Sequence, residues 1–171
     1  MRQGEAVGDL EVSVGYVLKQ AQAALRVAMD EALGPVGLTV SQYSCLELLG
    51  QRPGLSGSEL ARGAFVSRQS MNQVLRGLED RGLLARPPTA AHGRALPTEL
   101  TSAGRAALRT ASSAVADVEQ RMLTSLDEER RRRLCHDLAA CARALTEGRG
   151  VAGRDGVGVA HPTPTEQDAA P

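Results

Sequence analysis

Residues 67–82 read SRQSMNQVLRGLEDRG, a pattern that predicts a helix with one apolar and one polar face. The apolar stripe can pack on other helices and consists of Met71, Val74, Leu75 and Leu78. Ser67 is a favourable N-cap, and Gly82 suits the position just past the C-terminal end. The polar face carries side chains that can bind base edges and phosphates, because Arg pairs with guanine and Asn or Gln with adenine. These side chains are Arg68, Gln69, Asn72, Gln73 and Arg76.

A shorter helix is expected just before this one. The sequence Ser56-Gly57-Ser58-Glu59 fits a capping box, with Ser56 at the N-cap, that opens a helix through about Arg62. Residues 64–66 then form a short turn. Two helices joined in this way, the second polar and rich in Arg, form a helix-turn-helix motif. We therefore predict that the helix from Ser67 enters the major groove of double-stranded DNA.

Two short extended segments follow, at residues 83–87 and 94–100. They predict a β-hairpin whose loop of about six residues is longer than the tight two-residue turns. A hairpin directly after a recognition helix is a wing, and Arg94 at its tip can reach the adjacent minor groove or its phosphates. The expected fold is therefore mainly α with a small β-hairpin wing.

Two further helices are expected before the helix-turn-helix motif. Apolar residues recur with spacings of three and four from Leu10 to Ala32, which predicts an amphipathic helix of about 24 residues. Gly34-Pro35 should end it. Thr39 and Gln42 form a second capping box and open the next helix. The apolar side of that helix contains Tyr43, Cys45, Leu46 and Leu49.

Two long helices are expected after the wing. Thr101 can cap a helix to about Thr124, and Ser125-Leu126-Asp127-Glu128 is a third capping box that opens the last helix. The apolar face of the last helix would contain Leu126, Leu134, Leu138, Cys141 and Leu145. Helices from both ends of the chain thus have apolar stripes and little further core to meet, so we expect them to pack on a second copy. The chain should be a homodimer.

Length and charge restrict the class of protein. The 171 residues suit one domain, and 20 basic residues balance 20 acidic ones, which argues against a generally polycationic binder. Residues 62–105 nevertheless contain seven Arg and three acidic residues, an excess of four positive charges around the predicted DNA-binding elements. The chain has two Tyr, one Phe and no Trp, which disfavours single-strand binding by base stacking. No apolar run is long enough for a membrane span, so we expect a cytoplasmic protein.

The predicted elements divide the chain into functional segments. Residues 1–9 form a flexible N-terminus, residues 10–36 and 101–146 form dimerisation helices, and residues 37–100 form a winged helix-turn-helix DNA-binding domain. Residues 147–171 contain mainly Gly, Pro, Ala and Thr with little aliphatic surface to bury, so they are expected to be a disordered tail.

Short motifs along the chain resemble, in order and spacing, the MarR family of transcriptional regulators from about residue 10 to 146. They are LTVSQY at 38–43, PGLS at 53–56, ELA at 59–61, VSRQS at 66–70, LEDRGLL at 78–84 and LTSAGR at 100–105. The resemblance implies a repressor that binds a pseudo-palindromic operator as a homodimer, with half-sites about 10 bp apart. One departure is the wing tip, where the family has Asp-x-Arg and this chain has His92-Gly93-Arg94, so the acid that orients the arginine is absent.

The resemblance also suggests roles for individual residues. Base edges would be contacted by Arg68, Gln69 and Asn72, and the flanking minor groove by Arg94. Further candidate DNA contacts, most of them nearer phosphates, are Ser56, Ser58, Ser67, Ser70, Gln73 and Arg76. In the resembling family a small aromatic or phenolic anion binds between the dimer helices and the winged helix. Candidate effector residues by this layout are Tyr16, Arg26 and Tyr43, with core packing as the alternative for both tyrosines.

The three cysteines are expected to be free thiols. Members of the resembling family sense oxidants through cysteine, which makes Cys45 and Cys135 candidate redox residues. Cys141 is expected in the core. Cys135 and Cys141 are six residues apart on a helix and so do not share a face as metal ligands would. We therefore expect neither a metal site nor a cofactor.

Two other classes of function remain as alternatives. A winged helix can act as a protein-interaction module, with its Arg-rich side on an acidic partner; salt-dependent shifts of duplex DNA distinguish this from a DNA binder. An enzyme is disfavoured because no nucleophile, base and orienting group converge in any motif. Gly148–Gly153 matches G-x-G-x-x-G but follows a helix instead of a strand. The arginine run at 130–133 is interpreted as a solvated helix face, paired at i,i+4 with Glu128 and Glu129.

Overall fold

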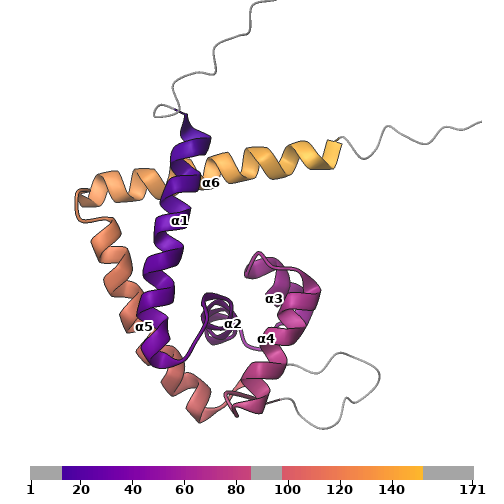
Figure 1. The fold of residues 1–171 in the computed structure, drawn as a ribbon. Coiled ribbons are helices and arrows are strands. Elements are labelled where there is room, and N and C mark those ends of the chain that lie inside the picture. Colours follow the sequence, from indigo (N-terminus) through magenta and orange to yellow (C-terminus); the bar gives the residue numbers. More distant parts are fainter. Residues whose placement is uncertain (1–12, 86–97, 152–171) are drawn as a thin grey trace, which may run out of the picture. The chain divides into compact units, whose positions relative to one another are not determined.

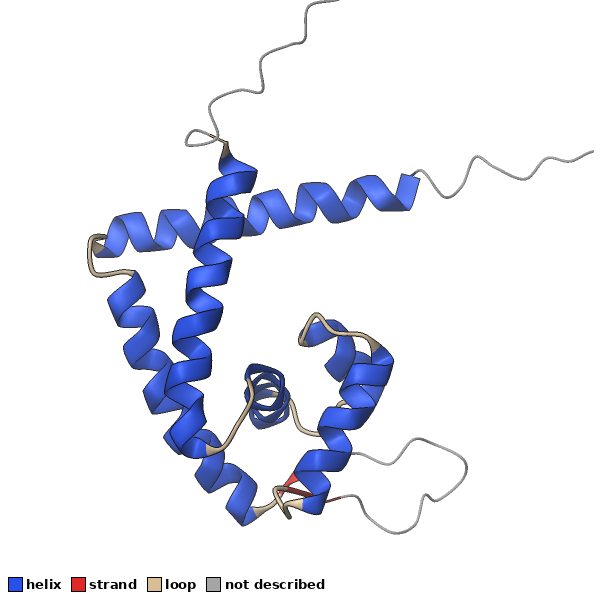
Figure 2. Ribbon diagram, in the orientation of Figure 1, coloured by secondary structure: helices blue, strands red, loops and turns tan. Residues whose placement is uncertain are grey.

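The computed structural model describes residues 13–85 and 98–151, with side chains up to residue 147. Its elements in chain order are α1 (Val14–Leu33), η2 (Gly34–Val36), α2 (Val40–Gln51), α3 (Gly57–Gly63), α4 (Arg68–Asp80), β1 (Leu84–Ala85), β2 (Glu99–Leu100), α5 (Ser102–Met122) and α6 (Glu128–Val151) (Figure 1, Figure 2). The predicted fold class is confirmed, because the described residues are mainly helical and contain an antiparallel two-stranded hairpin. The chain up to Thr124 forms one compact unit, and the chain from Ser125 forms a second.

The long first helix, α1, packs along α5 within the first unit. The sequence predicted its start at Leu10; the described helix begins at Val14, and residues 10–12 lie outside the described residues. Its end agrees with the prediction, because Gly34 and Pro35 begin the short 3₁₀ helix η2. α1 is exposed along its first half and enters the core only at its last turn.

Two of the three predicted capping boxes are present. At the start of α2, the backbone amide of Gln42 donates to Thr39 Oγ1 at 3.2 Å, and the backbone amide of Thr39 donates to Gln42 Oε1 at 3.0 Å. At the start of α3, the Ser56 amide donates to Glu59 Oε2 at 2.8 Å, and Glu59 donates its own amide to Ser56 Oγ. Each box satisfies backbone donors that the first helical turn leaves unpaired.

The third predicted capping box, at Ser125, is wrong. α6 begins at Glu128, and its N-cap side chain is Asp127, whose Oδ1 accepts from the amide of Arg130 at 2.8 Å. Asp caps a helix as well as Ser does, and its negative charge also favours the helix N-terminus. Leu126 therefore precedes α6 and is not part of its apolar face.

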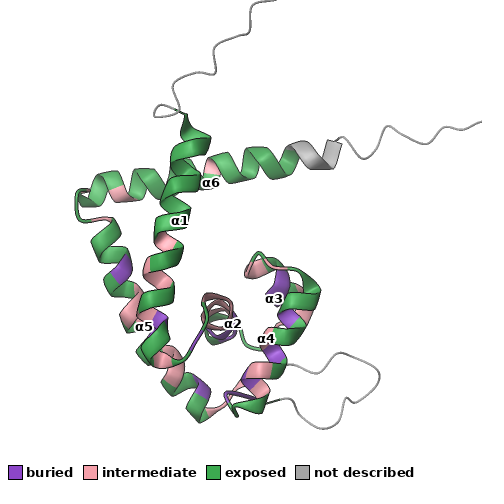
Figure 3. Ribbon diagram, in the orientation of Figure 1, coloured by how far each residue is buried: buried purple, intermediate pink, exposed green. Residues whose placement is uncertain are grey.

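The core of the first unit lies where α2, α3 and α4 meet the end of α1 and the start of α5 (Figure 3). Its largest fully buried side chains are Leu33, Cys45, Leu46, Leu49, Leu60, Met71, Leu75 and Leu78. The predicted apolar sides of α2 and α4 supply most of these residues. The core therefore holds the predicted helix-turn-helix elements against both long helices.

The end of α4, the hairpin and the start of α5 are joined by hydrogen bonds. Gly82 has a φ of 66°, as predicted for the residue past the helix end, and the Leu83 amide donates back to the carbonyl of Leu78 at 2.9 Å. Thr101 Oγ1 donates to the Gly82 carbonyl at 2.7 Å and accepts from the Gly104 amide at 2.9 Å. Thr101 thus caps α5, as predicted, while it bonds to the end of α4.

Most described side chains of α6 are exposed to solvent in the single chain. Its apolar positions Leu134, Leu138 and Leu145 are exposed, and so is Cys141, which the sequence placed in the core. That prediction was wrong because periodicity assigns residues to a face of a helix without showing what covers the face. The exposed apolar face is available to a second copy.

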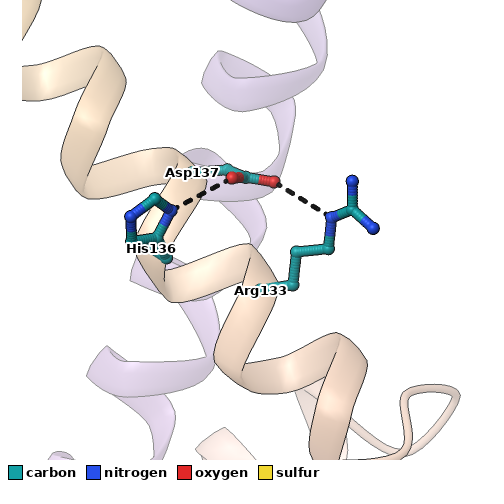
Figure 4. Close-up of polar contacts among 3 residues, drawn as sticks. All are labelled: Arg133, His136 and Asp137. Atoms are coloured by element: carbon teal, nitrogen blue, oxygen red, sulfur yellow. Dashed lines mark hydrogen bonds and ion pairs between the residues drawn. The ribbon is translucent and has the colours of Figure 1, made fainter.

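The charged face of α6 is solvated, as predicted, but its ion pair differs. Arg133 pairs with Asp137, with 3.9 Å between Nε and Oδ2, and His136 Nδ1 lies 3.4 Å from Oδ1 of the same carboxylate (Figure 4). Among the described side chains, neither Glu128 nor Glu129 forms the predicted i,i+4 pair. Exposed pairs of this kind contribute little to stability.

Cys45 is completely buried in α2, which argues against its predicted redox role. Burial raises the pKa of the Cys45 thiol to about 12, because the thiolate would lose its hydration. Oxidants and alkylating agents attack the thiolate, so a thiol with this pKa is inert near neutral pH. The apolar packing of Cys45 agrees with its predicted place on the apolar side of α2, and its redox role stays a prediction that this burial disfavours. Cys135 is exposed, and its redox role stays a prediction.

Gly104→Ala should lower the free energy of unfolding by about 3 kcal/mol, because the added Cβ would overlap the backbone carbonyl oxygen of Leu83. Gly77→Ala in α4 is the matched control, since its Cβ would meet only Gln42 Nε2 at an ordinary 3.6 Å. It should stabilise the protein by up to about 1 kcal/mol through helix propensity. Denaturant unfolding followed by circular dichroism measures both. Equal stability of the two variants would contradict the packing described here.

Cys45 should stay unmodified when the folded protein is treated with iodoacetamide at about pH 8, and should react once the chain is unfolded. Peptide mass mapping of Cys45 and Cys135 measures this. Because the folded pKa lies above the reference value of 9.0, this group's contribution to stability is constant below that pH and falls as the pH rises toward 12. Modification of both cysteines at equal rates in the folded protein would show that Cys45 is accessible.

Candidate nucleic-acid interface

α4 is held at its start by Ser67. Its Oγ accepts from the amide of Ser70 at 3.0 Å, and the two hydroxyl oxygens lie 2.9 Å apart. The N-cap predicted from the sequence is therefore confirmed. Both serines remain exposed, so their hydroxyl groups can also bind an external acceptor.

The two faces of α4 are separated as predicted. Met71, Leu75 and Leu78 are buried, and Val74 is half-buried. The opposite side forms an exposed polar surface, which we call the recognition face: Arg68, Gln69, Asn72, Gln73 and Arg76. Within the described residues, none of these five side chains has a hydrogen-bond or ion-pair partner. Their donors are therefore available to a partner outside the chain.

The charge on the recognition face favours an anionic partner. It contains two guanidinium groups and no carboxylate, while the acids of α4, Glu79 and Asp80, lie in its last turn. The start of the helix adds the partial positive charge of its unpaired backbone amides. Arg68 is the first residue of α4, so the cationic group and the helix N-terminus lie at the same end. This end can accept a phosphate group.

The two predicted contacts at the start of α3, Ser56 and Ser58, are half-buried. The Ser56 hydroxyl donates to Glu59 Oε2 at 2.6 Å, and this hydrogen bond, followed by the one from the Ser56 amide, lowers the pKa of the Glu59 carboxyl group. Ser56 is thus engaged in its cap. Contacts of Ser56 and Ser58 with DNA stay predictions.

The base of the wing is described, but its tip is not. β1 pairs with β2 in antiparallel register, with Leu84 opposite Leu100 and Ala85 opposite Glu99. This pairing starts four residues after the end of α4, so the hairpin begins next to the helix. Arg94, with the rest of 86–97, lies outside the described residues, and its groove contact stays a prediction.

Phe65, in the turn between α3 and α4, was not among the predicted site residues. Its side chain is 95% exposed, and its φ of 55° lies in the left-handed region. Glycine is the usual sequence signal for such a position, so a phenylalanine there could not be recognised from the sequence.

The three predicted effector residues lie on two helices. Tyr16 and Arg26 are exposed on α1, where Arg26 Nε is 3.9 Å from Asp30 Oδ2. Tyr43 on α2 donates its hydroxyl to Glu47 Oε2 at 3.3 Å, and the same oxygen accepts from Ser112 Oγ at 3.2 Å. Burial raises the pKa of the Tyr43 phenol. No hydrogen bond joins the three, and their role as an effector site stays a prediction.

Two cavities in the first unit lie elsewhere. One, of about 620 Å³, is an apolar groove between α1 and α5, lined in part by Leu25, Val27 and Met122. The other, of about 500 Å³, lies among α2, β2 and α5. It combines apolar side chains with two guanidinium groups, and its lining residues are Leu49, Gly50, Pro53, Glu99, Leu100, Arg105, Leu108 and Arg109. Arg105 Nη1 donates to the Leu100 carbonyl at 2.7 Å. The carboxylate of Glu99 also lines this cavity, beside the two guanidinium groups.

The remaining sequence motifs find no supporting geometry in the described part of the chain. The first residues of Gly148–Gly153 continue helix α6, so they do not form a strand-to-helix turn. No cluster of three His, Cys, Asp or Glu side chains that could hold a metal ion occurs among the described residues. None of the described helices has both the length and the apolar character that crossing a bilayer requires.

Comparison with known proteins agrees with this geometry. A family model described as the MarR family matches residues 36–95. The HTH-type transcriptional repressor Rv2887 of Mycobacterium tuberculosis is 44% identical over 122 residues, which cover 71% of this chain and 88% of that protein.

Solved structures show the same fold. Rv2887 in complex with DNA is 41% identical with a TM-score of 0.64, covering 76% of this chain and 98% of that one. Rv2887 in complex with salicylic acid is 42% identical with a TM-score of 0.64. The match covers 76% of this chain and 96% of that one. The repressor CouR bound to a 23-mer DNA duplex is 33% identical with a TM-score of 0.72. The match covers 82% of this chain and 99% of that one. Because the motifs occur in order, the fold agrees and the identity reaches 44%, the chain belongs to the MarR family of transcriptional regulators.

Proposed function

We propose that this chain represses transcription as a homodimer that binds a pseudo-palindromic operator through the recognition face of α4. The observation that supports this most directly is that its five polar side chains are exposed and unpaired among the described residues, while the opposite face of the same helix is buried. Arg68, Gln69 and Asn72 occupy the first turns of α4 and would contact base edges. Arg76, one turn further, would bind phosphate.

Exposed apolar side chains support the homodimer. Val14 is 72% exposed and Leu18 is 47% exposed on α1, and Met122 at the end of α5 is half-exposed. The apolar groove between α1 and α5 continues this surface. A second copy would cover it, with residues 10–36 and 101–146 as the dimerisation segments. Two-fold symmetry then places the two recognition faces about 10 bp apart on the duplex.

Repression by DNA binding needs no catalytic group. The protein would act in the cytoplasm, where bacterial DNA lies. A protein-interaction module is less well supported, because the similar repressors Rv2887 and CouR were both solved with DNA. A gel shift with random duplex DNA at low salt, and with the promoter beside the protein's own gene, distinguishes the two functions.

A small aromatic anion is proposed as the effector that releases DNA. The support is that the similar Rv2887 was solved with salicylic acid. Tyr16, Arg26 and Tyr43 remain the predicted contacts, and the cavity with Arg105 and Arg109 offers a second site of suitable charge.

Asn72→Ala should relax the base preference at one position of each half-site, with a loss of about 1–3 kcal/mol on the preferred operator. Arg94→Ala should weaken binding to all duplexes and reduce the slope of log K against log salt by about 1. Fluorescence anisotropy at several salt concentrations measures both. Arg154→Ala, which removes a positive charge outside the proposed DNA-binding and dimerisation segments, is the control and should bind as wild type does. Wild-type binding by both the Asn72 and Arg94 variants would refute the proposed function.

Salicylate should lower the affinity of the wild type for its operator, since an aromatic carboxylate matches the proposed effector chemistry. The Tyr16→Phe/Arg26→Ala/Tyr43→Phe variant should need about tenfold more salicylate for the same release, as expected when a charge-assisted hydrogen bond is lost. Arg109→Ala tests the second cavity in the same titration. A triple variant that responds as wild type does would remove the three residues from the effector site.

A further inference from the structure

Phe65 holds a backbone conformation that normally requires glycine. Its amide donates to the Arg62 carbonyl at 3.3 Å, and the Val66 amide donates to the Ala61 carbonyl at 3.0 Å. This pair of hydrogen bonds closes the end of α3 and needs a left-handed residue at the position that Phe65 occupies. The other described residues with positive φ are Gly37, Gly54 and Gly82. A Cβ is unfavourable in this region, so folding alone would favour glycine at position 65.

The ring of Phe65 contributes nothing to the core. It is 95% exposed, the highest value among the exposed large apolar side chains of the described chain. The neighbouring Ala64 and Val66 are half-buried and pack against the core, so the turn itself is anchored. An anchored turn thus presents an aromatic ring to solvent, at a cost to the backbone and with no gain in burial.

Phe65 lies in the turn that leads directly into α4. It precedes the N-cap Ser67 by two residues, so its Cα lies within about 7 Å of the Cα of Ser67. The N-terminal residues of a recognition helix contact base edges in helix-turn-helix complexes. The turn that leads into such a helix therefore lies at the edge of the major groove.

We propose that Phe65 is a DNA contact whose ring packs against apolar atoms at the edge of the major groove, either deoxyribose carbons or a thymine methyl group. The inference rests on the proposed function, because it needs α4 in the groove. Apolar contact with the thymine methyl group is an established part of base recognition. The contact explains why an exposed, strained position carries a phenylalanine: its surface is buried only in the complex.

Phe65→Gly tests the contact because it should act in opposite directions on folding and on binding. The melting temperature should rise by about 3 °C, since strain is relieved and no buried surface is lost. Operator affinity should fall about tenfold, as expected for partial loss of one apolar contact. The salt slope should not change, because an apolar side chain releases no counterions. Phe65→Leu keeps an apolar group and should recover most of the affinity.

Operators with deoxyuridine in place of single thymines identify the atoms contacted. If one substitution removes the difference between wild type and Phe65→Gly, the ring meets that methyl group; if none does, it meets deoxyribose, and both results support the contact. Equal affinity of wild type and Phe65→Gly overturns it, including the case in which the variant changes only the oligomeric state. If the wild type binds no duplex, the proposed function itself fails and the contact with it.

Discussion

The position of α4 depends on the hydrogen bonds at the base of the wing. Thr101 Oγ1 bonds to the carbonyl of Gly82 at 2.7 Å, and the Thr101 amide bonds to that of Leu83 at 3.1 Å. Gly104 allows the start of α5 to lie directly against Leu83, since any Cβ there would overlap its carbonyl oxygen. At the other side, Arg81 Nη1 donates to the Gly37 carbonyl at 2.7 Å, in the turn that follows α1. The end of the recognition helix is therefore bonded to the segments next to both long helices of the first unit.

This arrangement explains how a dimer interface can determine DNA binding. The apolar surfaces available to a second copy lie on α1, α5 and α6, while the polar surface available to DNA lies on α4. Packed cores and backbone hydrogen bonds are stiff, so they transmit small displacements from one helix to the next. A shift of α1 or α5 in the dimer would therefore move α4 as well. Under the proposed function, the spacing of the two recognition faces is thus the quantity that an effector would change.

Much of this architecture could be predicted because the signals are local. The caps at Thr39, Ser56 and Ser67 and the left-handed Gly82 follow from side-chain chemistry within four residues, and each is present. The local signal at Ser125 failed because Asp127, two residues later, competes for the same role. The buried faces of α2 and α4 agree with their apolar periodicity, since the core covers both.

The features that the sequence could not show are those that depend on contacts between distant segments or on an unusual backbone conformation. Periodicity placed Cys141 on an apolar face but did not show whether the chain covers that face. The family resemblance suggested a redox role for Cys45, whereas the packing of α2 in the core buries its thiol completely. Phe65 gave no signal because the left-handed conformation is normally marked by glycine.

In the proposed complex, the recognition faces of the two protomers lie in two successive major grooves of one operator. Methylation interference with dimethyl sulfate measures this directly, because it places methyl groups on guanine N7 in the major groove. Two clusters of interfering guanines are expected, with centres about 10 bp apart on the operator selected by the purified protein. Interference absent from the major groove, or confined to a single cluster, would contradict it.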